Sequence, residues 1–477
     1  MDKIKNFFTK DNIIYLTIFA ILLLSSYSGL VDYDYYWQSD LGKHIIKDGN
    51  FNWIYNQVWG TTGISEYYDH EWLTNILFYL STLVGLRGIT IMKIVISIFL
   101  ASCVVMYIKS EDKELNDFSV LKIFIFIFIL STVFLKVKAY CISIGFVLLE
   151  IMFLKRYKKT LSNNYFIYML ILCILWNNMH SGSIILFFAI AGIYWFTDLR
   201  SNKKIPFYGI IYLLSTSINP YGYKLLLFNL AHFGDSIMKK YVFDWRGLDA
   251  KESYGVICAI LIFICIVNLY NVDIKENLFD VSMTFIIIFM GLQSVRHLVY
   301  LVPFFISVSL NNNHISVSLN KSVLKYILVF FTGLATVCNY DAFTCKTYNT
   351  DYAMNYIDDE LKDLLIKTNS SSSNGLFSDE VPLWGKGVKS FTSGAFPCTR
   401  QRFLDSYLMM WTGSNSQIES IIDYYGLTKF CFKKTNTLVD YYTVNCVLYE
   451  YLVNNDDYIC LYDSGYYCYF VRADLEY

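Results

Sequence analysis

Long apolar segments recur along the first 340 residues, separated by short polar turns. Several are shorter than the ~20 residues that cross a bilayer squarely. Short helices suit a bundle that borders a water-filled cavity, where a full hydrocarbon crossing is not required. The pattern predicts an α-helical polytopic membrane protein with about 11 transmembrane helices. The candidate segments are 12–31, 73–86, 89–108, 119–136, 139–154, 165–181, 182–197, 206–218, 254–270, 279–295, 298–309 and 324–340.

The composition of the chain supports a bilayer as its solvent. Of its 477 residues, 55% are hydrophobic and only 17% are charged, which is little charge for a soluble domain. The 39 basic and 40 acidic residues nearly cancel. A nucleic-acid partner is therefore not expected, because it would require an excess of basic residues.

The N-terminal segment is predicted to be a retained membrane helix. Three lysines, Lys3, Lys5 and Lys10, precede the apolar stretch from Ile13 to Leu24. No A-x-A-like cleavage site follows, and further apolar segments come at once. Since basic residues stay on the cytoplasmic side, the N-terminus is expected in the cytoplasm. The protein itself is expected to be a multi-pass protein of the plasma membrane.

Basic clusters orient the remaining segments. Residues 155–159 and 200–204 are expected inside, which places 176–180, 219–254, 296–297 and the C-terminus outside. Counting five full spans from the N-terminus instead puts Lys155 outside. One piece among residues 73–154 is therefore expected to be interfacial or re-entrant, and the sequence does not identify it.

The chain changes character after Asp341. Residues 341–477 are predicted to form a small extracytoplasmic α/β domain, following a membrane domain of residues 1–340 whose first outer loop is 32–72. Short β-prone runs at 431–432, 443–448, 458–461 and 466–471 alternate with helical patterns at 352–366 and 416–425.

Six of the twelve cysteines fall in this C-terminal domain. An even set in an oxidising compartment is consistent with disulfides. Free buried thiols are equally consistent, because no spacing resembles a known framework. The six are Cys345, Cys398, Cys431, Cys446, Cys460 and Cys468.

The first outer loop begins with two acids, Asp32 and Asp34, at the end of the first membrane helix. A carboxylate at this boundary can deprotonate an acceptor hydroxyl or help hold a divalent cation. Asp32, Asp34 and His70 are the candidate metal ligands. The alternative is that these acids are solvated helix ends beside an interfacial aromatic belt.

Arg296 and His297 form the second candidate site. Two basic side chains inside an apolar run are costly in lipid and suggest a function. Arginine can hold a phosphate through two hydrogen bonds, and histidine can add a proton or a further hydrogen bond. The alternative is that both side chains snorkel to the outer interface.

Three further pieces are weaker candidates. Residues 176–182 place polar groups, among them His180, where a helix should be apolar, although a lone histidine is more often structural. Residues 219–222 end a helix, which the local Pro and Gly explain. Lys136 and Lys138 are either phosphate contacts or loop residues.

The predicted topology places the acids, the histidines and Arg296 toward one compartment, as a site for a phosphorylated lipid and a polar acceptor requires.

At these residues the chain resembles the GT-C superfamily of membrane glycosyltransferases, and a group of bacterial multi-spanning proteins within or near it. Each matched motif is short, but their order and spacing together are more specific. Stretches around 377–385 and 402–405 resemble the soluble domain of the same group. The matched pieces are Asp32-x-Asp34-x-x-Trp37 with Gly42, His70-Glu71-Trp72-Leu73, Trp176-x-Asn178-x-His180, Asn219-Pro-Tyr-Gly222, and Ser294-x-Arg296-His297 with Pro303.

The resemblance implies transfer of a sugar from a polyprenyl-phosphate donor to a glycan or protein acceptor at the outer membrane face. It gives the acid role to Asp34, with Asp32 as partner, and the phosphate role to Arg296, with His297 beside it. His70, Glu71, His180 and Lys138 are predicted to contact substrate. Gln38 stands where the related pattern has His.

Three other functions remain open from the sequence. A polysaccharide polymerase or ligase would also use lipid-linked saccharides but needs no Asp-x-Asp loop. A transporter predicts inverted repeats and broken-helix pairs, and the sequence contains no repeat. A non-catalytic envelope scaffold would leave glycans unchanged when Asp34 is substituted.

Overall fold

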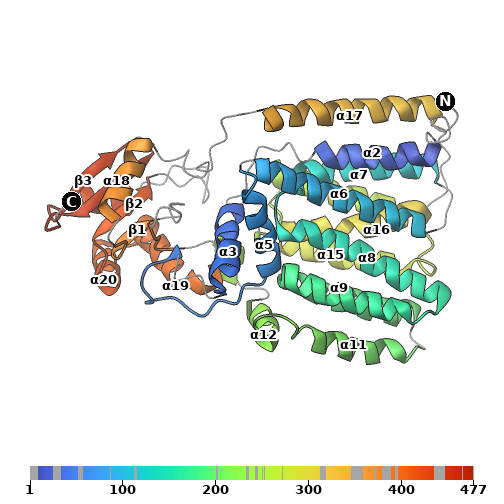
Figure 1. Ribbon diagram of the computed structural model, residues 1–477, viewed down its shortest axis with the longest axis horizontal. Helices are drawn as coiled ribbons and strands as arrows, with labels where there is room; N and C mark the ends of the chain where they lie inside the picture. Colours follow the sequence, from blue (N-terminus) through green and yellow to red (C-terminus); the bar gives the residue numbers. More distant parts are fainter. Residues whose placement is uncertain are drawn as a thin grey trace. The chain divides into compact units, whose positions relative to one another are not determined.

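The computed structural model is mostly helical, with a small four-stranded sheet near the C-terminus (Figure 1). Contacts divide the chain into two compact units, Met1–Asp32 with His70–Thr347, and Tyr33–Asp69 with Tyr348–Tyr477. We call these the helical unit and the mixed unit. The structure describes residues 9–24, 34–51, 57–85, 87–111, 115–199, 202–232, 236–241, 245–249, 251, 253–270, 272–311, 319–344, 358–369, 372–378, 388–392, 396–434, 446–464 and 466–475.

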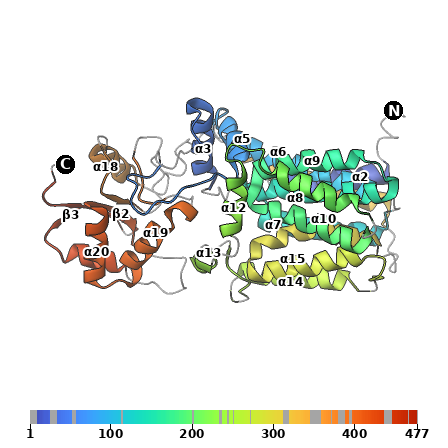
Figure 2. The ribbon, with the colours of Figure 1, turned by 90° about the horizontal axis from the view of Figure 1, so that it is seen from below.

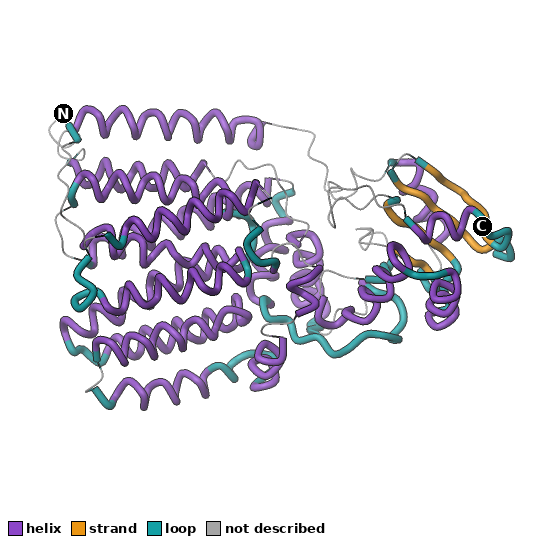
Figure 3. Tube along the Cα trace, turned by 180° about the vertical axis from the view of Figure 1, so that it is seen from behind, coloured by secondary structure: helices purple, strands orange, loops and turns teal. Residues whose placement is uncertain are grey.

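All twelve apolar segments contain an α-helix, as predicted, and long helices lie side by side in the helical unit (Figures 1 and 3). Polar caps set some of the boundaries. Asn116, for example, accepts a hydrogen bond from the Phe118 amide and begins α7. The helices are α2 (Lys10–Leu24), α5 (Trp72–Thr82), α6 (Arg87–Ser110), α7 (Asp117–Phe134), α8 (Ala139–Thr160), α9 (Asn164–His180), α10 (Ile184–Asp198), α11 (Lys204–Ser215), α12 (Tyr223–His232), α13 (Ser236–Tyr241), α14 (Ser253–Asn268), α15 (Leu278–Gln293), α16 (Leu301–Asn311) and α17 (Lys321–Thr344).

Two apolar helical segments of the described chain, Gly88–Ser110 and Asn164–Asp198, are long and apolar enough to cross a membrane. The predicted number of about 11 spans goes beyond this finding. The second segment is 35 residues long, but the 3₁₀ turn η2 (Ser181–Ser183) interrupts it between α9 and α10. An ion pair between Lys158 and Asp198 joins the C-terminal ends of α8 and α10. Helix α10 therefore runs back beside α9 (Figure 2).

The mixed unit contains one sheet with the strand order β1-β2-β4-β3. Strand β1 pairs with β2 in parallel, and the other two pairings are antiparallel. Three of the four predicted β-prone runs lie in strands. Of the fourth, 443–448, residues 443–445 lie outside the described residues, and the rest is not a strand because a helix begins at Val447. The elements are α3 (Asp34–Asp48), α18 (Asp359–Asn369), β1 (Leu376–Ser378), α19 (Phe396–Tyr407), η7 (Leu408–Thr412), α20 (Asn415–Tyr425), β2 (Lys429–Lys433), α21 (Val447–Val453), β3 (Tyr458–Asp463) and β4 (Tyr467–Arg472).

Turn chemistry positions the parallel β1–β2 pair. Ser414 and Gln417 form a reciprocal capping box that begins α20, and Gly426 ends this helix at φ 64°. Gly375 enters β1 at φ 77°, and a side chain there would lie 2.6 Å from the Thr428 hydroxyl oxygen. Glycine is therefore required at 375, both for its backbone conformation and for this close approach.

Residues 33–69 of the predicted outer loop 32–72 belong to the mixed unit, whereas Asp32 and residues 70–72 belong to the helical unit. The sequence-based division had placed the whole loop with the membrane domain. Residues 57–59 pair with Ser390, whose amide donates to the Gln57 carbonyl at 2.8 Å. The Trp59 indole N–H donates to the Leu376 carbonyl at 2.6 Å. This loop is thus hydrogen-bonded to residues more than 300 positions away in the sequence.

Arg402 fastens the same loop inside the mixed unit. Its side chain is fully buried and donates to the carbonyls of Thr62 at 2.8 Å, Trp59 at 2.9 Å and Phe391 at 3.1 Å. The guanidinium lies 5.1 Å from the Trp59 ring centroid and 4.9 Å from that of Phe391. The resemblance drew attention to residues 402–405, and in this structure Arg402 is a structural cross-link.

Asp405 has a local partner as well. The Tyr425 hydroxyl donates to its carboxylate at 2.6 Å, and burial together with this bond raises the pKa of Tyr425.

Four of the six C-terminal cysteines, 431, 446, 460 and 468, are described and are free thiols. Cys345 and the side chain of Cys398 lie outside the described residues. Of the two alternatives, disulfides and free thiols, the structure therefore has free thiols at the described cysteines of this domain.

Replacing Arg402 should loosen the mixed unit. Arg402→Met removes charged donors from three carbonyls, and we expect a loss of roughly 2–4 kcal/mol in unfolding free energy. The matched control is Arg472→Met, which removes a half-exposed arginine that pairs with Asp474. Limited proteolysis of the purified full chain should cleave the mixed unit faster only in Arg402→Met. Equal cleavage of both variants would contradict the assigned role.

Candidate functional site

The candidate site in the helical unit lies where the start of α5 meets the turn between α9 and α10. The Ser181 amide donates to the His70 carbonyl at 2.7 Å. The Trp72 indole N–H donates to the Asn178 side-chain oxygen at 2.9 Å. Two predicted motifs, residues 70–73 and 176–180, are thus brought together although about 105 residues separate them.

Glu71 lies between two imidazole rings. Its Oε1 atom is 3.6 Å from His70 Nε2 and 3.4 Å from His180 Nε2. The side chains of His70, Glu71 and His180 are 28%, 13% and 3% exposed, so access decreases from His70 inward. A side chain at Gly182 would come within 3.3 Å of the His70 ring, and glycine there leaves room for that ring.

Two hydroxyls hold the other face of His180. Its Nδ1 atom is 2.7 Å from Ser143 Oγ and 2.9 Å from Ser183 Oγ. The Trp176 indole N–H donates to Ser183 Oγ at 2.7 Å, and the Tyr300 hydroxyl also interacts with both serines. Helices α8, α9 and the 3₁₀ turn η4 (Val295–Tyr300) therefore meet at these side chains.

The direction of these hydrogen bonds follows from their chemistry. An indole N–H can only donate, so Ser183 accepts from Trp176. A bare ring nitrogen facing a carboxylate would be repelled, so His180 presents Nε2–H to Glu71 and accepts a serine proton at Nδ1. A carboxylate in this position can accept a hydrogen bond or a proton from a hydroxyl group.

Arg296 provides a positive charge close to this cluster. Its guanidinium carbon lies 4.3 Å from the centroid of the Trp245 ring, and the side chain is half-buried. Within the described chain, Arg296 has no acidic partner and no hydrogen-bond partner. Arg296 and His297 both lie within electrostatic range of His180. An anion that entered here would meet a stacked guanidinium whose charge no carboxylate neutralises.

The loop that carries Trp245 is tied to the segment that carries Arg296. The Val295 amide donates to the Arg246 carbonyl at 3.1 Å, and the Leu248 amide donates to the Leu292 carbonyl at 3.3 Å. This short pairing fixes the indole ring against the guanidinium. The sequence contained no signal for Trp245, because the contact depends on two segments about 50 residues apart.

The remaining predicted site residues are not among the side chains of this cluster. Asp34 begins α3 of the mixed unit, and its Oδ1 accepts from the Trp37 indole at 3.0 Å. Asp32 is outside the described residues. Lys138 immediately precedes α8, five positions before Ser143, and is half-buried. No group of three His, Cys, Asp or Glu side chains among the described residues is arranged to hold a metal ion.

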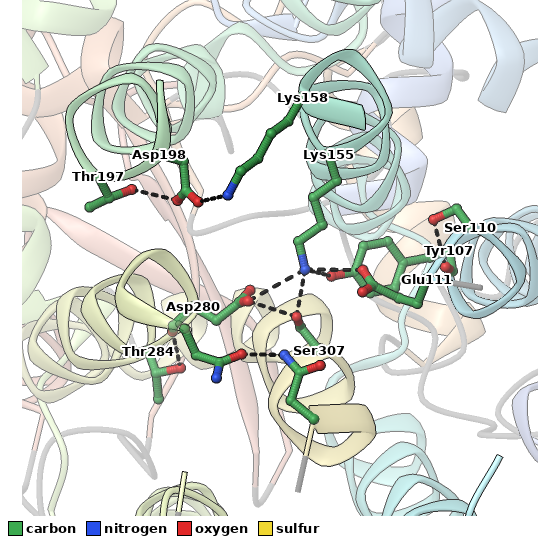
Figure 4. Close-up of polar contacts among 12 residues, drawn as sticks. Tyr107, Ser110, Glu111, Lys155, Lys158, Thr197, Asp198, Asp280, Thr284 and Ser307 are labelled. Atoms are coloured by element: carbon green, nitrogen blue, oxygen red, sulfur yellow. Dashed lines mark hydrogen bonds and ion pairs between the residues drawn. The ribbon is translucent and has the colours of Figure 1, made fainter. Parts of the chain in front are cut away.

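A second polar cluster lies at the other end of α8, about 18 Å from Ser143 at 1.5 Å per residue. Lys155 donates to Ser307 at 2.6 Å and to Glu111 at 3.0 Å, and lies 3.4 Å from Asp280 (Figure 4). It also donates to the Tyr107 hydroxyl at 3.0 Å. Sequence analysis had interpreted Lys155 only as a marker of topology.

Glu150 is a further titratable residue on α8, and sequence analysis missed it. It is fully buried, and neither carboxyl oxygen has a hydrogen-bond partner among the described residues. The signal was present, because a glutamate inside the apolar run 139–154 is costly unless it is neutral or functional.

Comparison of the sequence with known protein families and with characterised proteins finds no match.

Removing Lys155 should destabilise the helical unit. Lys155→Met leaves Glu111 and Asp280 buried without their cation, and breaking such a network costs roughly 3–5 kcal/mol. Lys158→Met, on the same helix, breaks a pair whose lysine is 47% exposed and should cost under about 1 kcal/mol. Heating with a thiol-reactive dye follows exposure of buried cysteines such as Cys103 and Cys265. Equal midpoints for both variants would show that the network does not stabilise the unit.

Proposed function

We propose that the protein is an inverting membrane glycosyltransferase that moves a sugar from a polyprenyl-phosphate donor to an extracytoplasmic acceptor. The observation that supports this most is the Arg296 guanidinium, which is stacked on Trp245 and has no acidic partner in the described chain. Beside it, the cluster of His70, Glu71 and His180 offers further polar contacts.

The charge that develops on the donor explains the use of an arginine. A lipid phosphodiester carries one negative charge, and the phosphate monoester that leaves carries close to two. Stabilisation that increases along the reaction accelerates it, and an arginine can bind the departing oxygens through two parallel hydrogen bonds. Stacking on Trp245 orients the guanidinium in advance, so little reorganisation accompanies the reaction.

A bilayer setting is supported by the outward faces of the helical unit. Large apolar side chains are exposed on many of its helices, as a surface covered by lipid requires. They occur on several helices, for example Leu214 on α11, Phe263 on α14, and Phe330 and Val337 on α17, all at least 62% exposed.

One assignment of the spans satisfies all basic-residue markers. Helix α5 has only 11 residues, so we propose that it is the non-crossing piece among residues 73–154. Eleven helices then cross, and the ends carrying Glu111, Lys155 and Asp280 fall on one side, as their contacts require. The His180 turn and Arg296 fall on the opposite, outer side.

Asp34 is the proposed acceptor base, as the resemblance implies. The hydroxyl of the acceptor attacks the anomeric carbon from the face opposite the phosphate, a new C–O bond forms, and the bond to the phosphate oxygen breaks. The hydroxyl proton passes to Asp34, and the electron pair leaves with the phosphate near Arg296. The Trp37 indole N–H donates to Asp34 Oδ1 at 3.0 Å and so helps to orient this carboxylate.

The mixed unit is proposed to bind the acceptor. Helix α3 is anchored to this unit through Gln57, whose amide donates to the Trp37 carbonyl at 3.2 Å and to Asp40 at 3.1 Å. The proposed base is therefore attached to the unit that would hold the acceptor glycan or protein.

The decisive comparison uses cells that carry Arg296→Ala, Asp34→Asn or the control Lys158→Met at equal membrane levels. Arg296→Ala and Asp34→Asn should each lose one surface glycan modification by at least a factor of about 100 and accumulate a polyprenyl-phosphate sugar. Lys158→Met should match wild type. Glycans that are unchanged in both site variants but altered by gene deletion would overturn the transferase and favour a scaffold or transporter.

A further inference from the structure

Glu150 lies in the middle of α8, seven residues after Ser143 and five before Lys155. Its side chain is fully buried, and both oxygens are without a partner in the described chain. Neither the phosphate contact nor the acceptor base of the proposed reaction involves it. We propose that Glu150 is a proton-binding site, which keeps a bound proton in the folded protein at neutral pH.

The surroundings of Glu150 contain no compensating charge. Helices α6, α9, α10 and α16 pack against α8. Two titratable groups interact electrostatically with Glu150, Cys173 of α9 and Tyr212 of α11, and both are neutral at pH 7. No charged group among the described residues acts on Glu150. The positive charges of α8 itself lie at its C-terminal end, where Lys155 is already bound to Glu111 and Asp280.

A bound proton is the ligand that fits these surroundings. An isolated carboxylate in an apolar interior costs far more than a neutral acid, whose single O–H group is the only donor left unsatisfied. A metal cation would need several oxygen ligands around it, and no group of three His, Cys, Asp or Glu side chains that could hold one is found in the described part of the chain. Buried ionisable residues within membrane helices commonly mark places where protons are held or passed on.

The proposal has a quantitative consequence for stability. In the unfolded chain Glu150 is ionised near neutral pH, so folding takes up one proton at this residue. Raising the pH therefore disfavours folding of the wild type relative to Glu150→Gln, whose amide has the shape of the neutral acid and takes up no proton. The ratio of folded to unfolded wild type, relative to the variant, should fall tenfold per pH unit.

The experiment is equilibrium unfolding of the purified full chain in mixed detergent micelles between pH 5 and pH 8. The control is Glu276→Gln, which removes an exposed glutamate of the same unit and should keep the pH dependence of wild type. If the free energy of unfolding of Glu150→Gln depends on pH as that of wild type and Glu276→Gln does, Glu150 is ionised in the folded state, and the proposal is overturned.

A second measurement tests the proposal on the wild type, so that it holds even where Glu150→Gln does not fold. The infrared carbonyl band of a protonated carboxyl should be present in wild type at pH 8 and absent from Glu150→Gln or Glu150→Met. An apolar carbodiimide should form an acylurea at Glu150 in detergent, identified by peptide mass. Absence of the protonated-carboxyl band from wild type would overturn the proposal. These results do not depend on whether the protein is a glycosyltransferase.

Discussion

The charge balance around Lys155 constrains the arrangement of the whole helical unit. One ammonium group faces two hydroxyls and two carboxylates, which come from α6, from Glu111 directly after it, from α15 and from α16. The two carboxylates depend on it because an unpaired buried charge is costly. Four helices are thereby held at one end. Since helices are stiff, fixing one end also limits where their other ends can lie, and the His180 cluster is at such an end.

The candidate site combines rigid and open elements. His180 is buried and held by two hydroxyls and a carboxylate, whereas His70 and Arg296 remain partly accessible. The fixed groups set the direction of the hydrogen bonds, because the Trp176 indole can only donate to Ser183, and the far side of His180 faces Glu71. The accessible groups are the ones that can reach a ligand. A preorganised polar cluster of this kind needs little rearrangement when charge develops next to it.

Sequence patterns predicted the helices well, because each is a nearly continuous apolar run between polar turns. Polar groups within apolar runs drew attention to His180 and Arg296, and the outer loop with the family resemblance drew attention to His70 and Glu71. The structure brings His70, Glu71 and His180 together. What they could not supply was pairing. The contact of Arg296 with Trp245, the role of Lys155, and the association of residues 57–63 with Arg402 all depend on segments far apart in the chain. The end of the run 443–448 was predicted wrongly, because local β-propensity is outweighed where the helix begins at Val447.

The division of the mixed unit between two distant stretches of sequence has a consequence for synthesis. Residues 33–69 leave the ribosome long before their partners, since the Trp59 indole must wait for Leu376 and the Thr62 carbonyl for Arg402. Contacts of such high sequence separation form late. During translation the nascent chain therefore carries an unfinished N-terminal segment while the helices between are being made, and the groups of this segment that bind residues 376–402 are still unpaired. Completion of the C-terminus is the event that gives this segment a fold.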